Sequence, residues 1–169
     1  MNFELIGALK TAYEAEKDGV RTYLDFAKKT EAAGAKDMFI QLALDEVDHM
    51  ELLQNFMEKT LMGQTYTTVE VPEGRLAAIR ADIDDASRKK LAPSEVSDEQ
   101  ALKIAMEQEI KAKEFYLAEA EKAEDQAVKD FFTKMAGVEQ KHYDILSAEL
   151  NYMQNSGFWF DAMEFSLEK

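Results

Sequence analysis

Apolar residues recur every three to four positions in four long stretches of the chain, and no stretch keeps the strict alternation of a β-strand. This spacing gathers the apolar side chains on one face of a helix, where they can pack against other helices. The pattern predicts helices over residues 2–33, 36–60, 98–124 and 127–153.

Glycine, proline and a capping pattern mark the predicted connections. Gly34 is expected to end the first helix, and Ser97 begins Ser-Asp-Glu-Gln, a pattern that opens helices. The segment 61–97 holds both prolines and is the one long connection, with a short helix expected over 75–89. Because the other links are short, the helices should form two antiparallel hairpins joined by one crossover. The sequence therefore predicts an all-α four-helix bundle.

The two predicted hairpins resemble each other in sequence. Aligning residues 9–53 with residues 102–146 gives 17 identities in 45 positions, far above chance. Four polar pairs are among them: Glu16 with Glu109, Tyr23 with Tyr116, Glu46 with Glu139, and His49 with His142. The bundle is therefore expected to consist of two copies of one unit.

Composition and charge narrow the function. The chain has 169 residues, 46% of them hydrophobic, which fits one globular domain. Its net charge of -14 disfavours nucleic acid and anionic membranes as partners. The absence of cysteine excludes disulfides, thiolate metal sites and a cysteine nucleophile. Without an apolar run of membrane length or a signal-peptide pattern, we expect a cytoplasmic protein.

Each predicted helix carries a glutamate on its apolar face, and the second and fourth add a histidine three residues later. The positions are Glu16, Glu46, His49, Glu109, Glu139 and His142. Four carboxylates buried together cannot all stay ionised without cations. Two divalent metals balance the four charges, whereas one does not. Because the ligands are oxygen-rich with one nitrogen per metal, two irons are expected, with manganese or a mixed pair as alternatives.

A single Glu-x-x-His pair in a chain this rich in glutamate is usually an accident on a solvated helix face. Here the chain has only two histidines, and each follows a glutamate by three residues and another by thirty-three. The doubling favours a dinuclear site. A structural bundle whose metals only hold it together stays as an alternative.

The motifs LDEVDHMELL and GVEQKHYDIL, with the upstream segments YEAEKDGVRTYLDFA and MEQEIKAKEFYLAEA, resemble the ferritin-like di-iron carboxylate superfamily, and within it the rubrerythrin family. The similarity extends over residues 3–153. It implies roles for the six residues: Glu16 and Glu109 as terminal ligands, Glu46 and Glu139 as bridging ligands, and His49 and His142 as nitrogen ligands.

The resemblance also implies that Tyr23 and Tyr116 donate hydrogen bonds to ligand carboxylates, although ordinary core packing would equally bury them. Two features depart from rubrerythrins. The cysteines of their rubredoxin-like domain are missing here, so electrons should come from a separate rubredoxin-like donor. Their extra carboxylate one turn after the third-helix ligand is replaced by Ala112, with Gly19 at the equivalent place in the first copy.

From this resemblance we expect an oxidoreductase of oxidative-stress defence that reduces hydrogen peroxide or dioxygen. Ferroxidase or iron-storage activity and dimanganese catalase activity are the alternatives. We expect a homodimer, domain-swapped or not, with residues 1–153 forming the bundle. The aromatic tail 154–169 should pack on the bundle or on a second subunit. Asp45 either orients the histidine of the opposite copy or lies in solvent.

Overall fold

A computed structural model describes residues 3–64, 96–157 and 159, and these residues form four helices without a strand. The helices are α1 (Phe3–Lys29), α2 (Ala33–Leu61), α4 (Val96–Lys122) and α5 (Gln126–Ser156). The predicted all-α four-helix bundle is confirmed. Most of the predicted crossover, including the short helix expected over 75–89, lies outside the described residues. Within the described residues, none of the helices combines the length and apolarity that a membrane span requires.

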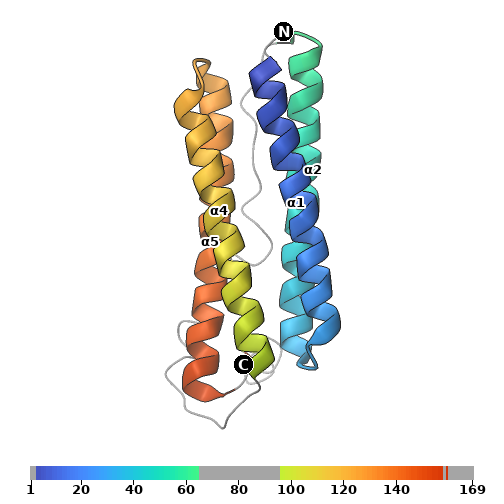
Figure 1. Ribbon diagram of the computed structural model, residues 1–169, viewed down its shortest axis with the longest axis vertical. Helices are drawn as coiled ribbons and strands as arrows, with labels where there is room; N and C mark the ends of the chain where they lie inside the picture. The colour runs from blue at the N-terminus through green and yellow to red at the C-terminus, as the bar shows by residue number, and fades with distance from the viewer. Residues whose placement is uncertain (1–2, 65–95, 158, 160–169) are drawn as a thin grey trace, which may run out of the picture.

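The bundle consists of two helix hairpins that stand side by side (Figure 1). Helix α1 packs along α2, α4 packs along α5, and α1 also contacts α4. In Figure 1, α2 ends at the top of the molecule while α4 begins at the bottom, so these two helices run in the same direction. This arrangement is the one that a single long crossover requires.

The turn of the first hairpin differs from the prediction. Helix α1 ends at Lys29 and α2 begins at Ala33, so Gly34 lies inside the first turn of α2 and does not end α1. Thr30 lies in this turn, and its hydroxyl donates to Asp98 Oδ2 of α4 at 3.1 Å.

The second hairpin has a cap at each end of α5. The carboxylate of Asp125 accepts hydrogen bonds from the backbone N–H of Ala127 at 2.8 Å and of Val128 at 3.4 Å. Gly157, with φ of 83°, closes the other end in the left-handed conformation that suits glycine. Helix α5 therefore continues to Ser156, three residues past its predicted end and across the predicted boundary with the tail. Helix α4 begins at Val96, which places Ser97 in its first turn rather than before it.

The apolar core is divided into two clusters along the length of the bundle. One contains Phe39, Leu42 and Leu146, and the other contains Leu9, Phe56 and Phe131. Since Glu46 and His49 lie between Leu42 and Leu53 on α2, their polar layer separates the two apolar clusters.

From the predicted aromatic tail, Trp159 packs on the bundle. Its ring meets Phe39 edge-on with a centroid distance of 5.7 Å, and its indole N–H donates to Asp98 Oδ2 at 2.8 Å. Asp98 therefore accepts from Thr30 of the first turn and from Trp159 of the tail. The other aromatic residues of the tail, Phe158, Phe160 and Phe165, lie outside the described residues.

Candidate metal centre

The structure brings together all six residues that the sequence singled out, in the polar layer between the two apolar clusters. Each of these residues is at most 4% exposed. They are Glu16, Glu46, His49, Glu109, Glu139 and His142. Each helix reaches this layer because its glutamate or Glu-x-x-His pair replaces an apolar residue on the inward face.

The six side chains form two overlapping groups of four. Glu16 and His49 belong to the first group, and Glu109 and His142 belong to the second. Glu46 and Glu139 belong to both groups, and in each group one oxygen or nitrogen atom per residue lies within 4.8 Å of the others. Two groups that share a pair of carboxylates suit two neighbouring metal ions.

Both histidines turn Nδ1 toward the shared carboxylates. His49 Nδ1 lies 2.8 Å from Glu46 Oε2 and 3.4 Å from Glu139 Oε1. His142 Nδ1 lies 3.6 Å from Glu46 Oε1 and 3.6 Å from Glu139 Oε2. The two rings are stacked, with centroids 5.5 Å apart and an angle of 19° between their planes. In each histidine Nδ1 is therefore the atom that faces the candidate metal positions.

Without metal, the mutual repulsion of the carboxylates shifts their protonation. Burial, together with the charge of Glu46, raises the pKa of Glu16 from 4.5 to about 8. Burial and the charges of Glu16 and Glu46 also raise the pKa of Glu139 well above its usual range. For Glu46 burial acts in the same direction, but the hydrogen bond with Glu16 and the charge of His49 outweigh it and lower its pKa.

The pKa values of the two histidines are raised, although burial alone would lower them. Burial alone would lower the pKa of His49, but the negative charges of Glu139 and Glu46 outweigh it and raise that pKa well above 6.5. The charge of Glu109 does the same for His142. Protons therefore take the place of cations in the metal-free cluster.

The donor atoms of the cluster fit a pair of metal ions. Among the described residues, both carboxylate oxygens of Glu139 and both ring nitrogens of His142 are buried and have no hydrogen-bond partner. Buried polar atoms without partners are rare in native proteins, and a metal would satisfy the Glu139 oxygens and Nδ1 of His142, whereas Nε2 of His142 faces Asp45. Carboxylate oxygen and imidazole nitrogen are the donors that iron and manganese prefer.

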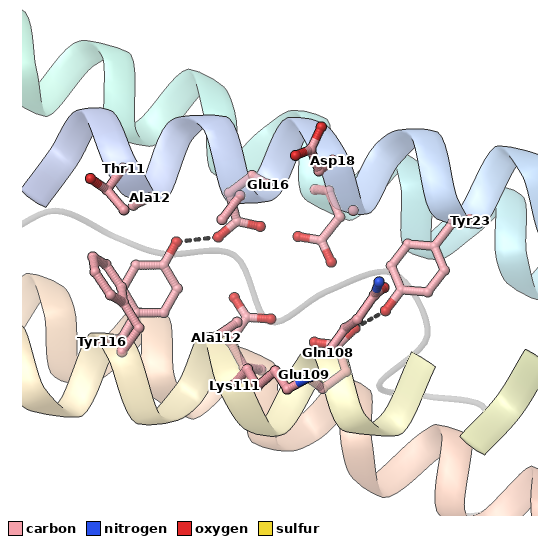
Figure 2. A pocket seen from close by; sticks show the side chains of 15 residues that line it. Thr11, Ala12, Glu16, Asp18, Tyr23, Gln108, Glu109, Lys111, Ala112 and Tyr116 are labelled. Atoms are coloured by element: carbon pink, nitrogen blue, oxygen red, sulfur yellow. Dashed lines mark hydrogen bonds between the residues drawn. The ribbon is translucent and has the colours of Figure 1, made fainter. Parts of the chain in front are cut away.

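Two tyrosines link each hairpin to a glutamate of the other (Figure 2). The hydroxyl of Tyr23 on α1 donates to Glu109 Oε1 on α4, and the hydroxyl of Tyr116 on α4 donates to Glu16 Oε1 on α1. Burial and the negative charges of the nearby carboxylates raise the pKa of both tyrosines well above 10.0. Their hydroxyls therefore stay protonated and act as donors.

Asp45 breaks the symmetry of the centre. Its side chain is 2% exposed, and Oδ2 lies 3.5 Å from Nε2 of His142, so Asp45 faces the histidine of the opposite copy rather than solvent. The equivalent residue of the second copy is Val138, which is buried and apolar. Only His142 therefore has a carboxylate at this position behind its ring.

A cavity of about 360 Å³ opens between α1 and α4 and reaches the cluster. Its inner lining includes all four glutamates of the centre and both tyrosines, and Figure 2 shows it from close by. Gly19 leaves space here, because a Cβ at this position would lie 3.4 Å from Cγ of Glu46. The sequence did not predict this cavity or its lining residue Gln108, since both depend on how the hairpins pack.

The fold and the centre define a ferritin-like carboxylate protein suited to two metals. The family model for rubrerythrin matches residues 7–150, and the chain therefore belongs to the rubrerythrin family, a ferritin-like di-iron family. Neither a curated protein nor a solved structure matches the chain.

Proposed function

We propose that this protein is a di-iron peroxidase that reduces hydrogen peroxide, or dioxygen, with electrons from a separate rubredoxin-like protein. The observation that carries the proposal is the pair of overlapping donor groups that share Glu46 and Glu139. Membership of the rubrerythrin family supports the same chemistry.

The residues of the centre have distinct tasks in this proposal. Glu16, Glu46, His49, Glu109, Glu139 and His142 would hold the ions. Two bound irons would supply the two electrons that cleavage of an O–O bond takes up. Tyr23 and Tyr116 fix the orientation of Glu109 and Glu16 through their hydrogen bonds. The cavity between α1 and α4 gives the oxidant a route from solvent to the four carboxylates.

The electron donor is proposed from the composition of the chain. A rubredoxin-type iron is held by four cysteine thiolates, and the sequence has no cysteine. We therefore propose that reducing equivalents arrive from another molecule, and that a one-electron donor delivers them in two successive encounters.

We also propose that the protein forms a homodimer. Ile40, Leu44 and Val47 are each at least 37% exposed and recur at helical spacing on α2. An apolar stripe of this kind suits the matching face of a second copy. Sedimentation velocity should give a species of twice 19.2 kDa, and Leu44→Glu should shift it to the monomer. A monomeric wild-type protein would contradict the dimer.

Peroxide turnover tests the main proposal. Protein reconstituted with ferrous iron without oxygen should consume hydrogen peroxide at a rate that depends on a reduced rubredoxin. Glu46→Gln should remove that turnover because it weakens both donor groups, whereas Glu51→Gln, an exposed glutamate on the same helix, should not. Oxygen evolution without a donor would indicate a catalase. Retention of oxidised iron well beyond two per chain would indicate ferroxidase or storage activity.

A further inference from the structure

The cavity between α1 and α4 is far larger than hydrogen peroxide requires. It encloses about 360 Å³, whereas a water molecule occupies about 30 Å³ in the liquid and hydrogen peroxide about twice that. Its volume falls within the range of pockets that hold small organic ligands. The size of the cavity therefore points to a substrate that carries an organic group and is larger than hydrogen peroxide.

The walls of the cavity are built to receive apolar groups. Ala12, Ala15 and Gly19 of α1 face Ala112 and Phe115 of α4. Gly19 and Ala112 are equivalent positions of the repeat, so the sequence keeps side chains small at the same place on both helices. An apolar group binds favourably here because such walls remove its surface from water.

The inner part of the cavity holds carboxylates and one carboxamide oxygen that has no hydrogen-bond partner. Its inner end is formed by the carboxylates of Glu16, Glu46, Glu109 and Glu139. Gln108 also lines it, and the carboxamide oxygen of Gln108 is buried without a hydrogen-bond partner. The equivalent residue on α1 is Ala15, so this acceptor lies on the α4 side alone. A ligand that satisfies Gln108 must donate a hydrogen bond from its polar end.

The mouth of the cavity carries charges of both signs. Asp18 of α1 and Lys111 of α4 are exposed and line the cavity. Asp18 is also paired with Arg21 at 2.8 Å, and four glutamates line the same cavity, so a neutral ligand is favoured over an anion.

We propose that this cavity binds an organic hydroperoxide, ROOH, with its apolar group against Ala12, Ala112 and Phe115 and its O–H donating to Gln108. The proposal rests on the peroxidase function proposed above and names the substrate class. The O–O bond breaks, two electrons and two protons enter, and the products are ROH and water. A reduced metal pair held by the six ligands would supply the two electrons, and the rubredoxin-like donor would replace them, one per donor molecule.

Binding is tested without turnover by the alcohol that the reaction would release. Protein loaded with two zinc ions, which carry no redox chemistry, should bind 2-phenyl-2-propanol in a saturable manner by calorimetry. Ala112→Leu should weaken this binding about tenfold or more, because the added isobutyl group occupies the cavity. Ala118→Leu, the same substitution at an exposed position of α4, should leave the binding unchanged.

Gln108→Leu serves as a second variant that keeps the cavity volume and removes the acceptor. It should also weaken binding of the alcohol, while zinc stoichiometry and melting temperature show that both variants fold. Absence of saturable binding to the wild type, or equal binding by Ala112→Leu, would overturn the assignment of the cavity.

Turnover then separates this inference from the function on which it rests. With one reduced donor, the ratio of kcat/KM for cumene hydroperoxide to kcat/KM for hydrogen peroxide should fall about tenfold or more in Ala112→Leu. An unchanged ratio would overturn the substrate class while hydrogen peroxide turnover still supports the peroxidase. Wild-type protein that binds the alcohol but consumes neither peroxide would contradict the peroxidase function and the substrate class together.

Discussion

Asp45 shows how one buried side chain makes the two halves of the centre unequal. His142 has the carboxylate of Asp45 at 3.5 Å from Nε2, while the residue of the second copy that is equivalent to Asp45 is Val138, which has no carboxylate. A carboxylate that accepts a hydrogen bond from the outer nitrogen of a ligating imidazole fixes the tautomer and makes the other nitrogen a better ligand, and a small shortening of this 3.5 Å separation would give His142 that partner. The metal held by the group of His142 is therefore expected to bind more tightly.

The first prediction follows for Asp45→Asn. This variant should weaken one of the two metal positions about 10- to 100-fold and leave the other nearly unchanged. Stepwise titration with ferrous or cobaltous ions, followed spectroscopically, would separate the two positions. Asp37→Asn, an exposed residue on the same helix, is the control. Equal weakening of both positions would show that Asp45 acts on the cluster as a whole rather than through His142.

The second prediction concerns Ala112, where rubrerythrins carry an extra carboxylate. Ala112→Glu would place a carboxylate in the cavity one turn beyond Glu109. If it reaches a metal, X-ray absorption should show ligation that changes between the oxidised and reduced states, and hydrogen peroxide turnover should rise. A glutamate that fails to reach metal would cost several kcal/mol as an unpaired buried charge. A folded variant with a new metal–carboxylate bond and unchanged turnover would contradict the link between ligand exchange and activity.

The six clustered residues were predictable from the sequence because each interrupts an apolar helix face and because the pattern occurs twice. The orientation of Asp45 was not predictable, since its position next to Glu46 fits either solvent or the opposite helix. The spacing of apolar residues along a helix predicts neither the cavity nor the role of Gln108. Their environment depends on the distance between α1 and α4, which residues on both helices decide together.

At the scale of the helices, the periodicity of apolar residues predicted that the four helices exist, and the lengths of the links predicted their directions. The exact ends of the helices were predicted less well, because they depend on local interactions. Gly34 was expected to stop the first helix, but the turn lies earlier, between Lys29 and Ala33, and Thr30 within it donates to Asp98 of α4. Helix α5 ends at Ser156, and the left-handed conformation of Gly157 closes the helix three residues past its predicted end.

The third prediction tests the cap of α5. Asp125→Ala removes the acceptor for the backbone N–H groups of Ala127 and Val128 and should lower the free energy of unfolding by about 1 kcal/mol. Urea denaturation of the metal-loaded protein measures this change. Asp130→Ala, an exposed residue one turn further along α5, is the matched control. Equal losses in the two variants would show that the cap contributes no more than an ordinary surface carboxylate.

At the scale of the whole molecule, the free energy of unfolding depends on whether protons or metal ions neutralise the buried glutamates of the polar layer. Folded metal-free protein keeps a proton on Glu16 up to about pH 8, whereas the unfolded chain releases it near 4.5. The raised pKa values of His49 and His142 act in the same direction above 6.5. The lowered pKa of Glu46 adds stability that is complete above 4.5 and so does not change in this range.

The fourth prediction is that metal-free protein loses stability as pH rises from about 5 to 8, by about 1.4 kcal/mol per pH unit for each extra proton held by the folded state. Metal-loaded protein should show no such loss, because cations replace these protons. Thermal denaturation of both forms across this range provides the comparison. Identical pH profiles would mean that the carboxylates do not repel one another in the folded protein.

The central claim is that Glu46 and Glu139 are shared between two metals, and metal content combined with X-ray absorption tests it most directly. Protein reconstituted with iron should contain about two ions per chain, and the spectrum should show an iron–iron separation of about 3 to 4 Å. A single ion per chain, or two ions more than about 5 Å apart, would contradict the shared carboxylates, since a bridging carboxylate holds its two metals closer than that.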